Sequence, residues 1–259
     1  MSKAEKMTAP ASGAVNAPVK PNQTAVAVPD YIKQGSNRGS ENVKATDIII
    51  PRLDLVQALS PCLKKSDPEY IEGAEPGMLF NSLTRKLYGH AALICPVYYR
   101  TEYLVWRDRK KGGGFRGAFQ SNAEAQQRIK EEEEAPEEFE AIETGQQIVL
   151  VICEDGTIDE AVISMSRTKL KVSRQLNSLV RIAGGDRFSR TYTAMGVEEQ
   201  NANGDDYYNY SFGISGFPAR EVYEQAEKMY DSIASGNRKV VLDTDHEEQM
   251  KMADKVVPY

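Results

Sequence analysis

The chain has 259 residues, of which 41% are hydrophobic and 27% are charged, and its formal net charge at pH 7 is −6. A chain of this size and composition can bury a substantial core, which excludes a small scaffold that depends on disulfides or a structural metal for its stability. No apolar run approaches the roughly 18 residues of a membrane span, and the N-terminus lacks the layout of a signal peptide, so we expect no membrane contact and a cytoplasmic location.

Charge is unevenly distributed along the sequence. Residues 83–117, the first basic block, contain eight Lys and Arg residues against two acidic ones, and residues 164–192, the second basic block, contain seven against one. Residues 118–160 and 197–259 are acidic, with thirteen Asp and Glu residues each. The net charge therefore hides an alternation of basic and acidic segments that a random sequence of this composition would seldom show.

Residues 1–45 are rich in Ala, Pro, Ser, Asn, Gly and Lys, and we expect them to form a disordered N-terminal arm. A single folded domain is expected over residues 46–236. It begins with a strand over residues 48–59, for which a short helical turn is the alternative. Further strands are predicted over residues 78–83, 91–97 and 103–106, which together would form a small β-meander.

The end of the first basic block combines cations, aromatic rings and glycines. Three consecutive glycines, 112–114, lie among Arg107, Arg109, Lys110, Lys111 and Arg116. A polyanion with flat bases requires these properties: charge for its phosphates, rings for stacking and glycines for close approach. The alternative is an ordinary half-buried hairpin whose polar face is basic.

A helix is predicted from Ser121 to Ile129, with Ser121 as its N-cap and Glu124 at the capping-box position. Residues 131–143 follow as an acidic insertion. In the simpler interpretation this insertion is solvated. In the second interpretation its carboxylates mimic phosphates and occupy the basic surface when no ligand is bound.

Apolar runs over residues 147–153 and 157–165, joined by a turn at Gly156, predict a central hairpin. The next helix, over residues 166–183, is strongly amphipathic, and its polar side carries Arg167, Lys171, Arg174 and Arg181 without an acid among them. Exposed helix faces usually mix Glu with Lys, because such pairs stabilise a helix. The unmixed face favours a polyanion-binding surface, and a plain solvated face is the alternative.

The last part of the domain is predicted to be a hairpin and a helix. Strands over residues 188–197 and 207–215 would flank a turn at 203–206. A C-terminal helix is predicted over residues 218–235, ending at Gly236. Residues 237–259 are expected to form a mobile acidic tail.

No enzyme motif stands out in the sequence. It contains no phosphate-binding loop, no HExxH and no GxSxG pattern, and its two histidines are isolated. Three cysteines without a CxxC spacing indicate free thiols in preference to a zinc site. We therefore expect a non-enzymatic protein without a cofactor or metal. A metal-dependent nuclease is the less favoured alternative, built from Glu154, Asp155, Asp159, Glu160 and Lys169.

These elements predict an α+β protein with an OB-like antiparallel β-barrel core, one basic amphipathic helix after the central hairpin and a C-terminal helix. The expected phosphate contacts are Arg100, Arg107, Arg109, Lys110, Lys111, Arg116, Arg167, Lys171, Arg174, Arg181, Arg187 and Arg190. The stacking candidates are Tyr98, Tyr99, Tyr103, Trp106, Phe115 and Tyr192. Because side chains alternate along a strand, about half of these rings can face a ligand and the others belong to the core.

Four runs carry a resemblance to known proteins: Ile50 to Leu53, Tyr70 to Gly77, Pro96 to Tyr99 and Met165 to Lys171. They resemble a family of tailed-bacteriophage proteins that are encoded near replication genes and mostly have no assigned function. The resemblance implies a phage origin, a place in DNA metabolism and a location in the host cytoplasm. A weaker likeness is to phage single-stranded-DNA-binding proteins, which combine an OB fold with an acidic C-terminal tail that contacts replication partners.

The sequence thus favours a phage protein that binds single-stranded DNA with little sequence preference in replication, recombination or repair. Its tail would contact replication or transcription proteins, and homo-oligomerisation stays open. The rival hypothesis is an interaction protein that binds or inhibits a host or phage enzyme through its acidic segments.

Overall fold

The computed structural model describes residues 38–43, 49–132, 135–201 and 204–238. The chain separates into a unit of residues 1–42 and a compact unit of residues 43–259, and the elements below all belong to the second unit. The predicted N-terminal arm and acidic tail lie largely outside the described residues. Within those residues, no helix has both the length and the apolar composition needed to cross a membrane.

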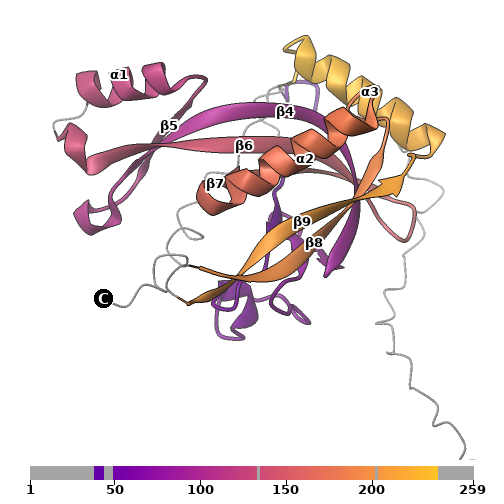
Figure 1. Cartoon of the computed structure of the whole chain (residues 1–259), viewed down its shortest axis with the longest axis horizontal. Coiled ribbons are helices and arrows are strands. Elements are labelled where there is room, and N and C mark those ends of the chain that lie inside the picture. The colour runs from indigo at the N-terminus through magenta and orange to yellow at the C-terminus, as the bar shows by residue number, and fades with distance from the viewer. Residues whose placement is uncertain (1–37, 44–48, 133–134, 202–203, 239–259) are drawn as a thin grey trace, which may run out of the picture. The chain divides into compact units, whose positions relative to one another are not determined.

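The larger of two sheets forms the centre of the compact unit (Figure 1). Its strands pair in the order β7-β6-β4-β8-β9, and all of these pairs are antiparallel. Strand β5 pairs antiparallel with the last part of β4, whereas β8 pairs with the first part. The bounds are β4 Ala91–Arg107, β5 Phe115–Phe119, β6 Phe139–Ile152, β7 Ile158–Ser166, β8 Thr191–Gln200 and β9 Asp206–Gly216. Antiparallel sheet and helices confirm the α+β class. The expected OB-like barrel is not closed by the described strands, because β7 and β9 end the sheet and do not pair with each other.

Strand β4 differs most from the prediction. The two strands expected at 91–97 and 103–106 are one strand of 17 residues, and the residues between them pair with β6. Tyr98 to Thr101 are themselves good strand formers, so the break in apolar character there is not a break in structure. Pro96 has no N–H to donate to a neighbouring strand, and the β4–β6 register shifts between Pro96 and Tyr98.

A small second sheet lies beside the first and contains β1 Leu53–Leu55, β2 Leu79–Asn81 and β3 Leu87–Gly89, in that order. The strand predicted over 48–59 is therefore much shorter, because the chain turns at Ala58 and Leu59 and enters a 3₁₀ turn at Pro61–Leu63. Strand β8 approaches the backbone of the β1–β2 connection at Gly196. A Cβ atom at Gly196 would overlap the Gly77 carbonyl oxygen, so the packing of the small sheet on β8 requires glycine.

Three helices cover the large sheet in the described part of the chain: α1 Asn122–Glu132, α2 Leu170–Ala183 and α3 Arg220–Ala234. Helix α2 packs on the face that contains Ile94, and α3 packs on the face that contains Cys95. These residues are neighbours in β4, so the two helices lie on opposite faces. Figure 1 shows α2 in front of the sheet and α3 at the upper right. The amphipathic patterns of α2 and α3 predicted both helices to within a few residues.

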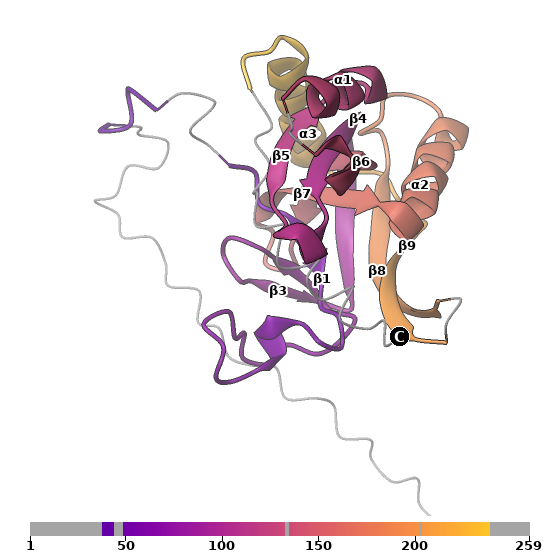
Figure 2. The ribbon, with the colours of Figure 1, turned by 90° about the vertical axis from the view of Figure 1, so that its left-hand side faces the viewer.

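Helix α1 and β5 pack at the far end of β4 and β6, in the foreground of Figure 2, and we call this part the distal lobe. The predicted N-cap is confirmed, because the Glu124 backbone N–H donates to Ser121 Oγ at 3.2 Å. The acidic insertion is shorter than predicted: β6 starts at Phe139, so residues 139–143 belong to the sheet.

Candidate nucleic-acid interface

Three glutamates around the start of β6 pair with cations of the two basic blocks, and we call them the carboxylate row: Glu138, in the 3₁₀ turn just before the strand, and Glu140 and Glu143 within it. Arg107 of the first block approaches Glu138 at 2.6 Å, and Lys111 lies 3.6 Å from the same carboxylate. The second block supplies Arg167, 2.7 Å from Glu140, and Arg174, 3.3 Å from Glu143. Cations that are far apart in the sequence therefore contact one short stretch of chain, residues 138–143.

The ion pairs with the second block are exposed to solvent. The side chains of Arg167 and Glu140 are 55% and 61% exposed, and Arg174 is 64% exposed. Exposed pairs of this kind contribute about 0–1 kcal/mol, because water competes for both charges. The hydrogen bonds from Arg107 lower the pKa of Glu138, so this carboxylate stays ionised at neutral pH. Glu140 and Glu143 thus neutralise Arg167 and Arg174 without binding them strongly, whereas Glu138 holds Arg107 by two hydrogen bonds.

Arg167 also has an unusual backbone conformation. Its φ is 51°, in the left-handed region, where β7 passes into the 3₁₀ turn Arg167–Lys169 that precedes α2. A residue with a Cβ in this region costs roughly 1 kcal/mol relative to glycine. The turn leaves the Arg167 guanidinium beside β6 instead of over the helix.

The hairpin between β4 and β5 places two cations of the first block beside the ring of Phe139. The guanidinium carbons of Arg107 and Arg116 lie 5.8 and 5.5 Å from the centre of this half-buried ring. Lys110 and Arg116 are exposed, and Arg109 belongs to a 3₁₀ turn whose backbone alone is described at that residue. Tyr103 and Phe115 are half-buried on the same lobe.

Two predicted stacking residues lie in the core. Tyr192 has no exposed surface beneath α2, and Trp106 is 8% exposed and packs against Phe115 at 5.0 Å between ring centres. Tyr98 packs toward α3, with its ring centre 6.1 Å from that of Tyr230. These rings are the part of the aromatic set that alternation along a strand directs into the core.

Arg187 and Arg100 are bound inside the protein and differ from the surface cations. Arg187 donates to Asn177 Oδ1 at 2.8 Å and also to Oε1 of the Gln147 side chain, and it lies over the ring of Tyr99. Burial lowers its pKa to about 10. On the other face, Arg100 contacts the buried Glu102 at 2.8 Å. Both arginines therefore hold the sheet together around interior polar groups.

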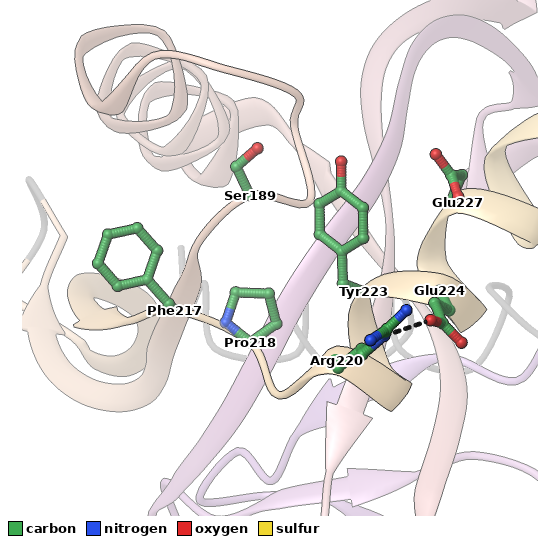
Figure 3. A pocket seen from close by; sticks show the side chains of 7 residues that line it. All are labelled: Ser189, Phe217, Pro218, Arg220, Tyr223, Glu224 and Glu227. Atoms are coloured by element: carbon green, nitrogen blue, oxygen red, sulfur yellow. Dashed lines mark hydrogen bonds and ion pairs between the residues drawn. The ribbon is translucent and has the colours of Figure 1, made fainter.

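Arg190, by contrast, lies at a second exposed location. Its guanidinium carbon is 3.7 Å from the ring centre of Phe217, and Phe217 is 71% exposed. Phe217 borders an open cavity of about 630 Å³ that Tyr223 and the Arg220–Glu224 ion pair of α3 close on the other side (Figure 3). The other two cations of the predicted set, Lys171 and Arg181, are exposed on α2.

Comparison with known proteins identifies the family. A family model described as Pam3 phage gp34-like protein matches residues 20–239. The chain belongs to the Pam3 phage gp34-like protein family. This membership confirms the expected phage protein family. Neither a curated protein nor a solved structure gives a significant match. The matched range of this Pam3 phage gp34-like protein contains the carboxylate row, both basic blocks and α3.

Three of the four acids of the nuclease alternative, all except Glu154, are engaged with cations or hydroxyls. Asp159 contacts Lys86 at 2.8 Å, Asp155 accepts a hydrogen bond from Thr157, and Glu160 pairs with Arg238. In the described ranges, no group of three or more His, Cys, Asp or Glu side chains is placed to hold a metal ion. Lys169 follows the end of β7, whereas Asp159 lies at the start of that strand, and the Lys169 ammonium lies over the ring of Tyr210 in β9.

Sequence reasoning missed two polar clusters. The first joins Lys86, Tyr88 and Cys153 around Asp159, with Tyr88 donating at 2.9 Å. The second surrounds Gln147, which is fully buried and donates to Ser173 Oγ at 2.9 Å. A Gln-Gln pair directly before the apolar run of residues 148–152 was the signal for the second cluster, since buried amides require partners. The first had no signal, because its members come from separate strands.

Proposed function

We propose that this protein binds single-stranded DNA of the phage along the surface formed by the carboxylate row and the cations around it. One observation carries the proposal: the first basic block pairs with Glu138 and the second with Glu140 and Glu143, so two blocks that are separated in sequence by an acidic block converge on residues 138–143. A row of carboxylates bound by arginines and lysines has the charge pattern of a phosphate backbone. DNA phosphates could therefore replace the glutamates as partners of the same cations.

The energetics of this replacement favour binding. Breaking an exposed Arg–Glu pair costs little, about 0–1 kcal/mol, while each phosphate contact releases condensed counterions from the DNA. The glutamates would keep the unliganded surface from attracting anions indiscriminately. The second interpretation of the sequence is that the acidic insertion mimics phosphates when no ligand is bound. The proposal restricts that role to Glu138, Glu140 and Glu143, which contact the cations in the structure.

Several features support a single strand and a weak sequence preference. Asn177, one of the two residues of α2 suited to reading bases, accepts hydrogen bonds from Arg187 and Gln147 and is thereby occupied. Half-buried rings on the distal lobe, Phe139 and Phe115 among them, offer stacking faces that accept any base. We place the activity in phage replication, recombination or repair, with protein partners and oligomeric state open.

Fluorescence anisotropy with a labelled oligo-dT of about 30 nucleotides, measured at several salt concentrations, tests the proposal. Wild-type protein should bind at micromolar concentration or tighter, with affinity that falls steeply with salt. The double variant Arg167→Ala/Arg174→Ala should bind more weakly and reduce the slope of log K against log salt by about 2, roughly one for each phosphate contact. Trp106 emission should change little, because the ring is in the core.

The matched control is Arg220→Ala, which removes an exposed arginine that is likewise paired with a glutamate, Glu224 of α3. Its affinity and salt slope should equal those of wild type. Absence of binding at low salt, or an unchanged slope in the double variant, would contradict the proposal. The acidic segments would then be tested for a protein partner by the rival hypothesis.

A further inference from the structure

A cavity of about 480 Å³ opens between the segment after β1 and the start of β9. Its walls are mainly apolar and aromatic, and they include Leu55, Pro61, Phe80, Tyr207 and Tyr208. Lys169, from the turn before α2, also lines it. Enclosed volumes of several hundred Å³ with few polar groups are typical of small-molecule sites. The cavity is separate from the carboxylate row, since Lys169 and Arg167 extend to different sides of their turn.

Two cations line this cavity, Arg85 and Lys169. Arg85 pairs with Glu69, whereas the Lys169 ammonium makes no hydrogen bond or ion pair within the described residues. This ammonium lies 5.3 Å from the centre of the Tyr210 ring, and the nearest acid that acts on it, Asp54, is bound by Arg52 at 2.9 Å. Burial lowers the pKa of Lys169, because the protein interior solvates the charge poorly. An ammonium in this position is stabilised when an anion enters.

The acids that line the cavity are all engaged elsewhere. Glu69 contacts Arg85 at 3.3 Å, Asp205 accepts from the Asn201 side chain at 3.0 Å, and Asp206 accepts from Gln200 at 3.2 Å. Lys169 is therefore the charged group of the lining that has neither a hydrogen-bond nor an ion-pair partner within the described residues. The partner that its ammonium lacks is an anionic group.

The aromatic wall is held in place before any ligand binds. The Gln57 side chain pairs with both backbone groups of Tyr208, at 2.9 Å each, as a neighbouring strand would. The Tyr208 ring also packs on Gly77, where a Cβ atom would overlap it. A preformed wall costs little entropy on binding, which favours affinity for a flat ligand.

From these observations we propose that the cavity binds a nucleotide, with the phosphate at Lys169 and the base against the aromatic wall. A nucleotide combines the two required properties, an anionic group and a flat, largely apolar body. The same chemistry could be supplied by a free nucleoside monophosphate or by the phosphorylated end of a DNA strand. The proposal rests on the cavity alone and does not depend on DNA binding at the carboxylate row.

Isothermal titration and thermal unfolding of the full chain with dTMP, thymidine and inorganic phosphate test this site. We expect dTMP to bind and to raise the Tm, with thymidine and phosphate each at least tenfold weaker. Lys169→Met should weaken dTMP at least tenfold, and without ligand it should unfold at no lower temperature than wild type, since an apolar group replaces a poorly solvated charge. Lys169→Arg should retain part of the affinity, and Lys65→Met, an exposed lysine after the 3₁₀ turn, should match wild type.

A short oligo-dT with and without a 5′-phosphate distinguishes the two sources. Tighter binding of the phosphorylated strand that is lost in Lys169→Met assigns the site to strand ends, and equal binding of the two strands assigns it to the free nucleotide. Saturation-transfer NMR on wild-type protein reports dTMP binding without any variant. Absence of dTMP binding at millimolar concentration, or equal affinity in wild type and Lys169→Met, would overturn the proposal. Arg167→Ala/Arg174→Ala should leave dTMP affinity unchanged, which separates this site from the strand-binding surface.

Discussion

Arg174 and Arg187 both belong to the second basic block, and the fold uses them in opposite ways. Arg174 is 64% exposed and touches Glu143 at 3.3 Å, so its partner can be exchanged at little cost. Arg187 donates to Asn177 at 2.8 Å and to the fully buried Gln147. The comparison teaches that a charge count locates cations, whereas packing decides which of them a ligand can reach.

The Lys86–Asp159 pair lies between these extremes. The two side chains are 35% and 29% exposed, and Tyr88 adds a second donor to the carboxylate at 2.9 Å. Burial thus increases from the Arg174–Glu143 pair through the Lys86–Asp159 pair to the contacts of Arg187. Substitutions in each should separate a structural role from a binding role.

The largest effect is expected for Arg187→Met. Removal of the guanidinium leaves Gln147 Oε1 without its donor and Asn177 Oδ1 with only the 3.2 Å bond from Gln147, which should lower the free energy of unfolding by about 2–3 kcal/mol. Urea unfolding followed by circular dichroism measures this. Arg220→Met, at an exposed arginine of α3, should change the same quantity by less than about 0.5 kcal/mol. Equal stability of the two variants would show that Arg187 does not hold the sheet.

An intermediate effect, with a pH dependence, is expected for Asp159→Asn. Burial acts to raise the pKa of Asp159, but the hydrogen bonds from Lys86 and Tyr88 outweigh it and leave the pKa below its usual value. A lowered pKa in the folded state adds stability above the unfolded pKa of about 3.9, and this stability is lost as the pH falls through the folded value. The variant should be less stable by about 1 kcal/mol at pH 7, after allowance for solvent screening.

Unfolding at pH 7, 5 and 3 provides the check for Asp159→Asn. The difference from wild type should persist at pH 5 and shrink toward pH 3. Asp231→Asn, at an exposed position of α3, serves as the control and should show no such trend. A difference that grows as the pH falls would contradict the assigned role of Lys86.

The smallest effect on stability is expected for Glu140→Gln/Glu143→Gln. Because both ion pairs are exposed, the free energy of unfolding should change by less than about 0.5 kcal/mol for each pair. Affinity for oligo-dT should rise several-fold, since the arginines no longer have competing carboxylates. Anisotropy titration at low salt measures it, and a weaker affinity would contradict the proposed exchange. Point substitutions are needed, because a deletion reaching residue 143 would remove the start of β6.

Helix periodicity made α2 and α3 predictable. Apolar residues repeat at helical spacing around Leu176 in α2 and around Ala226 in α3, and both of these residues are buried. Strand boundaries were harder, as β4 shows: Tyr98 to Thr101 interrupt the apolar pattern, yet the pairing with β6 continues. Sheet order could not be predicted, since antiparallel strands of similar composition fit several arrangements. The candidate site was likewise predictable only in part. Its cations were visible in the sequence, but their glutamate partners depended on strand register.

The continuous pairing of β4 with β6 has a mechanical consequence. From Leu93 to Arg107 the two strands share one ladder, which spans both the helix-covered centre and the distal lobe. The lobe therefore cannot swing as a separate body on a hinge; a pull on its tip is transmitted along two hydrogen-bonded strands to the layer between α2 and α3. Bending would concentrate where the register shifts, between Pro96 and Tyr98. The distal lobe is therefore a rigid extension of the central sheet.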